Sequence, residues 1–260
     1  MARPKSSRSW RKRELEFGTI IQAFYGIRNP ECVFSIAYSV SQFEESDGMS
    51  IASANGSFYY PNRMGRIILL SMRNHLGNQR LTEVLRAAGQ EQLINTRLLP
   101  NSLEKEFSFE TLSALQAASE QVFGPRAGRY INYRVGRGTF ERGLKDFDPL
   151  LGISDLPMRL MPMGTKLRVG LDVFAQVFNQ FTDQVVKLSE NETHHLWIIE
   201  RCPLCWKRQT EECCCQLANG LLDEAIFWGT GGHRFKVEEI NCVAMGQPNC
   251  TFRIEKQPLD

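Results

Sequence analysis

The chain has 260 residues, of which 42% are hydrophobic and 23% are charged, and its formal net charge is +2. This composition supports a sizeable buried core, either as one large domain or as one domain with an extension. It contains no run of about 18 apolar residues, so no membrane span is predicted. The first residues lack the apolar centre of a secretory signal, and we therefore expect a cytoplasmic protein.

The first thirteen residues form a basic segment. They contain six Lys or Arg residues and no acidic residue. A basic arm of this kind can contact nucleic acid or an anionic membrane surface, but it is more often a solvated tail. No helix-turn-helix or finger pattern follows it, so we predict a disordered tail over residues 1–13 and do not expect nucleic-acid binding.

Residues 14–60 carry the weakest pattern in the chain. Phe17, Ile20 and Phe24 have the spacing of a short amphipathic helix, and the segment from Cys32 to Ser57 contains seven serines, Ser57 included. We interpret this segment as an N-terminal extension and as the candidate for a homodimer contact. The main domain is predicted to cover residues 61–260.

Three helices are predicted in the first half of that domain. A helical stretch follows Pro61 and ends at Gly77, and a second helix covers residues 81–88. Ser108 is a good N-cap for a third helix, which Gly124 and the proline after it should end. The sequence Gly-Arg-Gly at 136–138 lacks the third glycine of a phosphate-binding loop, so we interpret it as a turn between helices.

A fourth helix is predicted over residues 171–188, where apolar residues recur every three or four positions. Leu196 to Ile199 then forms a short buried strand, and a further helix begins near Cys215. The aromatic residues of these elements either form ordinary core or enclose a ligand. The candidate pocket residues are Phe174, Phe178, Phe181, Trp197, Phe227 and Trp228.

Seven of the eight cysteines lie between positions 202 and 250, which is typical of metal binding in a chain without a secretory signal. Three thiols and one carboxylate make a closed tetrahedral shell for Zn²⁺. The alternative is that these cysteines are small buried hydrophobic residues. Within the run of three cysteines, Cys214 is the alternative to Cys215. The candidate metal ligands are Cys215, Glu239, Cys242 and Cys250.

Cys202 and Cys205 form a separate Cys-x-x-Cys pair. This spacing occurs in metal sites and in redox pairs. Together with nearby cysteines the pair makes either a second metal site, including an iron–sulfur cluster, or a pair of free thiols beneath Trp206. The sequence leaves these alternatives open.

The segment from Cys215 to Phe252 reads C-x4-G followed by V-x-E-x-x-C-x-A-x-G-x-x-x-C-x-F. In this pattern the chain resembles the 4-vinyl reductase domain family, whose fold is similar to the ligand-binding domains of nitric-oxide signalling and Golgi transport. The resemblance implies an α+β fold in which helices flank an antiparallel sheet and enclose an apolar pocket. It also implies a zinc-clipped C-terminal hairpin held by Cys215, Glu239, Cys242 and Cys250, and a tendency to form homodimers.

The resemblance leaves two functions open. The family includes accessory proteins of bacteriochlorophyll biosynthesis, which implies a reductase or an accessory subunit acting on the vinyl group of a chlorophyll precursor with an external electron donor. However, the sequence lacks a dinucleotide-binding glycine loop, and four protein ligands leave zinc no open position. We therefore favour a zinc-stabilised sensor or carrier domain for a small hydrophobic or aromatic ligand, tetrapyrroles included. Whether the chain is an enzyme stays open.

Overall fold

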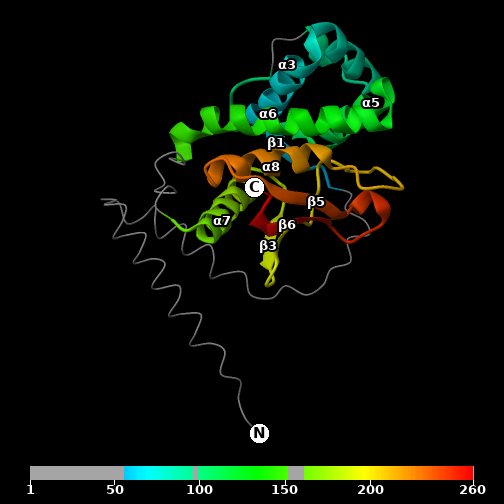
Figure 1. Cartoon of the computed structure of the whole chain (residues 1–260). Helices are drawn as coiled ribbons and strands as arrows, with labels where there is room; N and C mark the ends of the chain where they lie inside the picture. The colour runs from blue at the N-terminus through cyan, green and yellow to red at the C-terminus, as the bar shows by residue number, and fades with distance from the viewer. Residues whose placement is uncertain (1–55, 96–98, 152–160, 260) are drawn as a thin grey trace. The chain divides into compact units, whose positions relative to one another are not determined.

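The computed structural model describes residues 56–95, 99–151 and 161–259 (Figure 1). These residues belong to one structural unit that runs from Asn55 to Asp260. The predicted basic tail and nearly all of the predicted extension lie outside the described residues, as does the homodimer contact assigned to them.

The described residues contain one four-stranded sheet, in which every pair of neighbouring strands is antiparallel. The strand order is β3-β4-β6-β5, so the last strand of the chain is central and pairs with both β4 and β5. The predicted antiparallel sheet and C-terminal hairpin are confirmed. The strands are β3 (Val186–Glu190), β4 (His194–Ile199), β5 (Phe235–Asn241) and β6 (Cys250–Pro258).

A second, smaller sheet pairs one antiparallel strand from before the first described helix with one from before the third. The helices then pack on the larger sheet and on one another, which confirms the predicted α+β class. In Figure 1, α6 and α8 lie side by side, and the four-stranded sheet lies beside α8. The small sheet consists of β1 (Tyr59–Pro61) and β2 (Lys105–Ser108), and the helices are α3 (Asn62–Ala87), α4 (Gln92–Asn95), α5 (Phe109–Phe123), α6 (Pro125–Leu151), α7 (Met163–Phe181) and α8 (Gln216–Gly229).

The helix ends in the first half of the domain follow the sequence signals in part. The Ser108 hydroxyl accepts a hydrogen bond of 3.1 Å from the backbone N–H of Thr111, and α5 ends at Phe123, before Gly124, as predicted. The two helices predicted around Gly77 are joined in α3. Gly77 has φ +74° and a non-helical conformation, so it kinks the helix where we expected an end.

The prediction of a turn at Gly136 is wrong, because this residue lies inside α6. A Cβ atom at Gly136 would lie 2.1 Å from the carbonyl oxygen of Leu217 in α8. At Gly220 of α8, a Cβ atom would lie 1.9 Å from the carbonyl oxygen of Tyr133 in α6. Both glycines therefore let two helix backbones touch. The glycine-rich pattern reflects helix packing and not a turn.

The helix predicted over residues 171–188 ends earlier, at Phe181. The cause is local hydrogen bonding that competes with the helix. The Asn179 side chain accepts from the N–H of Val186 at 2.7 Å and donates to its carbonyl oxygen at 2.9 Å. The Thr182 hydroxyl accepts from the N–H of Gln184 at 2.9 Å. These bonds turn the chain out of α7 and into β3.

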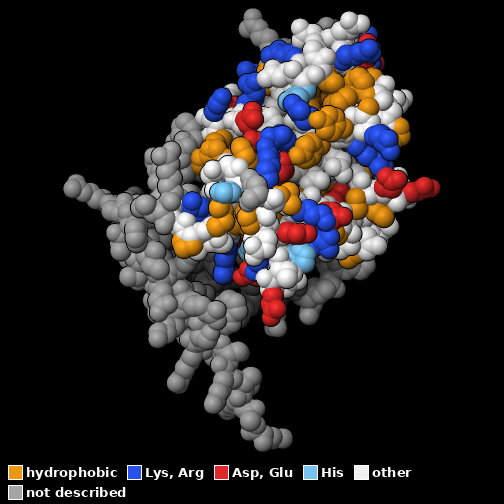
Figure 2. Space-filling view, viewed as in Figure 1, with side chains coloured by type: hydrophobic (Ala, Val, Ile, Leu, Met, Phe, Trp, Pro, Cys, Tyr) orange, Lys and Arg blue, Asp and Glu red, His pale blue; other side chains and the backbone are white. Residues whose placement is uncertain are grey.

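The face of the domain shown in Figure 2 carries basic and acidic side chains interspersed with apolar ones. No helix among the described residues is long and apolar enough to cross a membrane. The larger apolar side chains gather instead in one core, in which Trp197, Phe252 and Ile254 of the central strands are buried.

Candidate metal centre and adjacent cavity

The topology of the sheet explains why cysteines far apart in the sequence meet. Cys250 is the first residue of β6 and pairs with Ile199, the last residue of β4, so the segment that follows β4 starts beside it. That segment carries Cys202 and Cys205. On the other side, Cys242 follows β5 directly, and a short 3₁₀ helix over Val243–Met245 connects it towards β6.

The predicted ligand set comes together in the structure. The sulfur atoms of Cys215, Cys242 and Cys250 lie 3.8–3.9 Å from one another. Zn–S bonds of about 2.3 Å would place the sulfurs of a tetrahedral zinc about 3.8 Å apart. The carboxylate of Glu239 lies within 4.8 Å of all three sulfurs, and all four side chains are buried. The set therefore has the spacing and the donor atoms of a zinc site.

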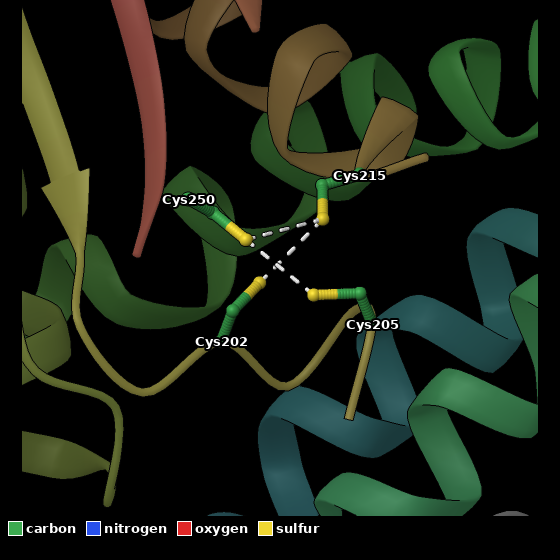
Figure 3. A group of neighbouring side chains, drawn as sticks. All are labelled: Cys202, Cys205, Cys215 and Cys250. Atoms are coloured by element: carbon green, nitrogen blue, oxygen red, sulfur yellow. Dashed lines mark hydrogen bonds between the residues drawn. The ribbon is translucent and has the colours of Figure 1, made fainter. Parts of the chain in front are cut away.

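A second set of four donors overlaps the first. The sulfur atoms of Cys202, Cys205, Cys215 and Cys250 lie within 4.8 Å of one another and point towards a common centre (Figure 3). Cys202 lies 3.6 Å from Cys215, and Cys205 lies 3.4 Å from Cys250. The Cys-x-x-Cys pair is thus part of the same cluster. Cys215 belongs to both sets, whereas Cys214, the alternative at this position, belongs to neither.

Glu239 has an oxygen atom that needs a partner. Its Oε2 accepts a hydrogen bond of 2.9 Å from the backbone N–H of Cys215, but Oε1 is buried without a hydrogen-bond partner. Burial, followed by the neighbouring Cys242, raises the pKa of Glu239 to about 9. Burial likewise raises the pKa of Cys215 well above its ordinary value. A bound dication reverses this preference for the protonated forms and satisfies the unpaired oxygen.

A partly buried cation lies next to the cysteines. The Arg208 guanidinium donates to Glu120 at 3.0 Å, while its second terminal nitrogen is buried without a hydrogen-bond partner. Burial alone would lower the pKa of Arg208, but Cys214, Glu120 and Cys215 raise it above its ordinary value. This positive charge partly offsets the effect of burial, which favours the protonated thiols.

The structure adds a positioning residue that the sequence did not indicate. Gln116 of α5 is buried and donates to the carbonyl oxygen of Leu204 at 3.0 Å, while its own oxygen accepts from the N–H of Leu217 at 3.4 Å. It therefore connects the Cys202–Cys205 segment to the first turn of α8. Gln116 lies more than eighty positions from its partners, so no local pattern could reveal it.

An apolar cavity of about 130 Å³ lies beside the metal centre. Its walls come from β1, α3, α6, α7, β4 and α8. Four of the predicted pocket residues line it: Phe174, Phe178, Trp197 and Trp228. Phe181 and Phe227 do not. Phe181 packs on Phe147 with a centroid distance of 6.0 Å, and Phe227 packs beneath the Arg234 guanidinium at 4.0 Å.

The aromatic wall of the cavity is a connected series of rings. Phe174 lies at its centre, with centroid distances of 5.1 Å to Phe178, 5.5 Å to Trp197 and 5.7 Å to Phe140. Phe140 in turn lies 6.2 Å from Trp228, the partly exposed member of the series. Such tilted and edge-to-face contacts are favourable for aromatic rings. They connect the wall to Trp228, whose side chain lies between the cavity and the surface.

Few polar groups face the cavity, and most of them already have partners. The Thr139 hydroxyl donates to a carbonyl oxygen of its own helix at 2.8 Å. The Tyr60 hydroxyl donates to the side-chain oxygen of Gln184, and burial raises the pKa of Tyr60 well above its ordinary value. Tyr60 is therefore neutral at physiological pH, and the cavity carries no charge.

Helix α8 connects the metal centre to the cavity. Cys215 stands at its N-cap, and the following turns contribute Leu217, Leu221 and Trp228 to the cavity wall. Leu204, which lies between Cys202 and Cys205, also lines the cavity. The position of two cavity walls therefore depends on the cysteine cluster.

Comparisons with known proteins show a likeness of fold at low identity. No family model matches the chain, and no curated protein matches it. The similar solved structures include H-NOX proteins. One from S. oneidensis in an Fe(II)NO state is 13% identical, with 75% of this chain and 99% of that one covered and a TM-score of 0.47. One from K. algicida is 11% identical, with 77% and 98% covered and a TM-score of 0.46. We draw no conclusion about function from this likeness.

Proposed function

We propose that this domain is a zinc-stabilised binding module for a small apolar molecule, acting as a sensor or carrier. Zinc on Cys215, Glu239, Cys242 and Cys250 would hold the start of α8, and α8 would in turn hold one wall of the cavity. The observation that carries the proposal is the uncharged cavity of about 130 Å³ beside a cluster of buried metal-type ligands.

The size of the cavity limits the ligand. An apolar cavity of about 150 Å³ in another protein accepts benzene, whereas sites for larger ligands measure about 300–1,000 Å³. A cavity of about 130 Å³ therefore matches a single aromatic ring. Because its walls are almost entirely apolar, we propose a monocyclic aromatic hydrocarbon or a molecule of similar size.

A tetrapyrrole, the larger ligand that the sequence left open, is not the ligand that a cavity of about 130 Å³ matches. It contains four pyrrole rings, and the cavity has the volume for one ring. None of the four histidines, which are common axial ligands of haem iron, lines the cavity. We therefore propose no tetrapyrrole chemistry. No observation on the described residues favours the reductase alternative, and we do not propose it.

Filling the cavity tests the proposal. Gly143 of α6 lines the cavity, and a Cβ atom there would meet no atom within 4 Å. Gly143→Phe would therefore place a ring in the space without displacing the backbone. Gly164 of α7 is a matched control, because its Cβ would also meet no atom within 4 Å, but it does not line the cavity.

The measurement is toluene binding to the purified full-length chain by isothermal titration calorimetry. We expect binding to the parent and to Gly164→Phe, and at least a tenfold loss of affinity in Gly143→Phe. Ala225→Phe fills the same space from α8 and should have the same effect. Failure of the parent to bind toluene, or equal binding by all variants, would refute the proposed ligand class.

A further inference from the structure

The two candidate ligand sets share one edge. Both contain Cys215 and Cys250, whose sulfur atoms lie 3.8 Å apart. The first set adds Cys242 and Glu239, and the second adds Cys202 and Cys205. Two tetrahedra that share an edge need six ligands, and the two sets together contain six. The number of donors therefore matches two four-coordinate ions.

The two outer pairs belong to separate sets. Among the described residues, the donors that lie within 4.8 Å of one another fall into these two sets, and neither set contains a member of the other's outer pair. The chain topology agrees with this division. Cys202 and Cys205 come from the segment after β4, whereas Glu239 and Cys242 come from β5 and its end. Each outer pair can therefore complete a separate ion.

The Cys-x-x-Cys pair is better explained as ligands than as packing. Both residues are buried, and both sulfurs point towards the shared pair (Figure 3). The distances of 3.6 Å from Cys202 to Cys215 and 3.4 Å from Cys205 to Cys250 are close to the edges of a zinc–thiolate tetrahedron. A single ion on the first set would leave the buried thiols of Cys202 and Cys205 without a metal ion to bind.

We propose that this cluster is a binuclear zinc centre, in which the thiolates of Cys215 and Cys250 bridge two Zn²⁺ ions. One ion is completed by Cys242 and Glu239, and the other by Cys202 and Cys205. Two dications with six anionic ligands leave a net negative charge, and the partly buried Arg208 guanidinium beside the sulfurs offsets part of it. The second ion rests on the proposed zinc site, because it shares two of that site's ligands.

Metal stoichiometry tests the number of ions. The full-length chain would be purified with Zn²⁺, and its metal content would be measured by elemental analysis and by native mass spectrometry. We expect about two ions per chain in the parent and about one in the double variant Cys202→Ser/Cys205→Ser. Cys213→Ser is the matched control, because Cys213 belongs to neither set, and it should keep both ions.

A second measurement does not depend on whether the variants fold. In the parent loaded with ¹¹³Cd²⁺, two bridging thiolates would give two cadmium resonances, each split by coupling to the other ion. This result would support the bridged pair. Two unsplit resonances or a single resonance would overturn it.

The outcomes also separate this proposal from the first zinc site. One ion in the parent that survives Cys202→Ser/Cys205→Ser but is lost in Glu239→Gln/Cys242→Ser would overturn the binuclear centre and leave the first site intact. One ion that is lost in Cys202→Ser/Cys205→Ser but kept in Glu239→Gln/Cys242→Ser would overturn both the binuclear centre and the first zinc site. It would assign the metal to the set of four cysteines. A parent without metal would also overturn both.

Discussion

The two regions that α8 connects are built in opposite ways. At the start of the helix, the candidate metal centre draws six donors from about fifty residues of chain between Cys202 and Cys250. Along the length of the helix, the cavity collects walls from elements spread between Tyr60 and Gly229. A few strong bonds would hold the first region, and many weak apolar contacts hold the second. The cavity should depend on the metal centre, because one of its walls needs α8 in place. The metal centre should not depend on the cavity, because the metal ligands stay together whether the cavity is empty or filled.

Removing a shared ligand should break both regions and have the largest effect. Cys250→Ser should abolish metal binding, because this thiol belongs to both ligand sets. Zinc contributes on the order of 10 kcal/mol to the folding of small zinc domains, which is comparable to the whole stability of a typical domain. We expect loss of cooperative thermal unfolding by circular dichroism and loss of toluene binding. An unchanged melting temperature in Cys250→Ser, relative to Cys213→Ser, would show that metal does not hold the fold.

Separating α6 from α8 should damage the cavity while the ligands themselves are intact. Gly220→Ala would place a methyl group 1.9 Å from the carbonyl oxygen of Tyr133, so the two helices must move apart. Overpacking of this kind costs about 3 kcal/mol. The free energy of unfolding from urea titration should fall by this amount. Gly164→Ala, at an open helical position, should not lower it, and equal values for both variants would contradict the close contact.

Loss of Gln116 should loosen the connection between the two regions. Gln116→Leu would leave the carbonyl oxygen of Leu204 and the N–H of Leu217 buried without their partner. Unsatisfied buried groups cost about 1–3 kcal/mol each, so we expect a loss of about 2 kcal/mol in urea unfolding. Ser113→Ala removes only one bond, to the carbonyl oxygen of Trp206, and should cost about half as much. A larger loss in Ser113→Ala would show that Gln116 is not the main connection.

The smallest effect should come from a methyl group in the cavity wall. Gly143→Ala adds a side chain where no atom lies within 4 Å, and it replaces a helical glycine with alanine. The higher helix propensity of alanine is worth about 0.5–1 kcal/mol, so the urea midpoint should rise. Toluene binding should persist, in contrast to Gly143→Phe. A fall in stability would show that the space at Gly143 is not open in solution.

The C-terminal hairpin and the convergence of the predicted ligands followed from local patterns. Strands with a tight connection bring their ends together, so the spacing of Glu239, Cys242 and Cys250 was enough to place them near one another. The end of α7 did not follow, because it depends on the side-chain amide of Asn179, which pairs with a residue seven positions away. The interpretation of Gly136 failed because a close approach of two helices and a turn both require glycine.

The amino-acid sequence by itself indicated the antiparallel hairpin, because a hairpin depends on residues close together in the chain. The resemblance of its C-terminal pattern to a known family implied the α+β class and the first candidate ligand set. Only the tertiary structure decided that Cys202 and Cys205 lie beside that set and share Cys215 and Cys250 with it, that Gln116 connects the surrounding segments, and that four of the six predicted aromatic residues line a cavity. These features depend on the pairing of β4 with β6 and on the contact of α6 with α8. Such long-range contacts arise from packing of the whole domain, and no single stretch of sequence encodes them.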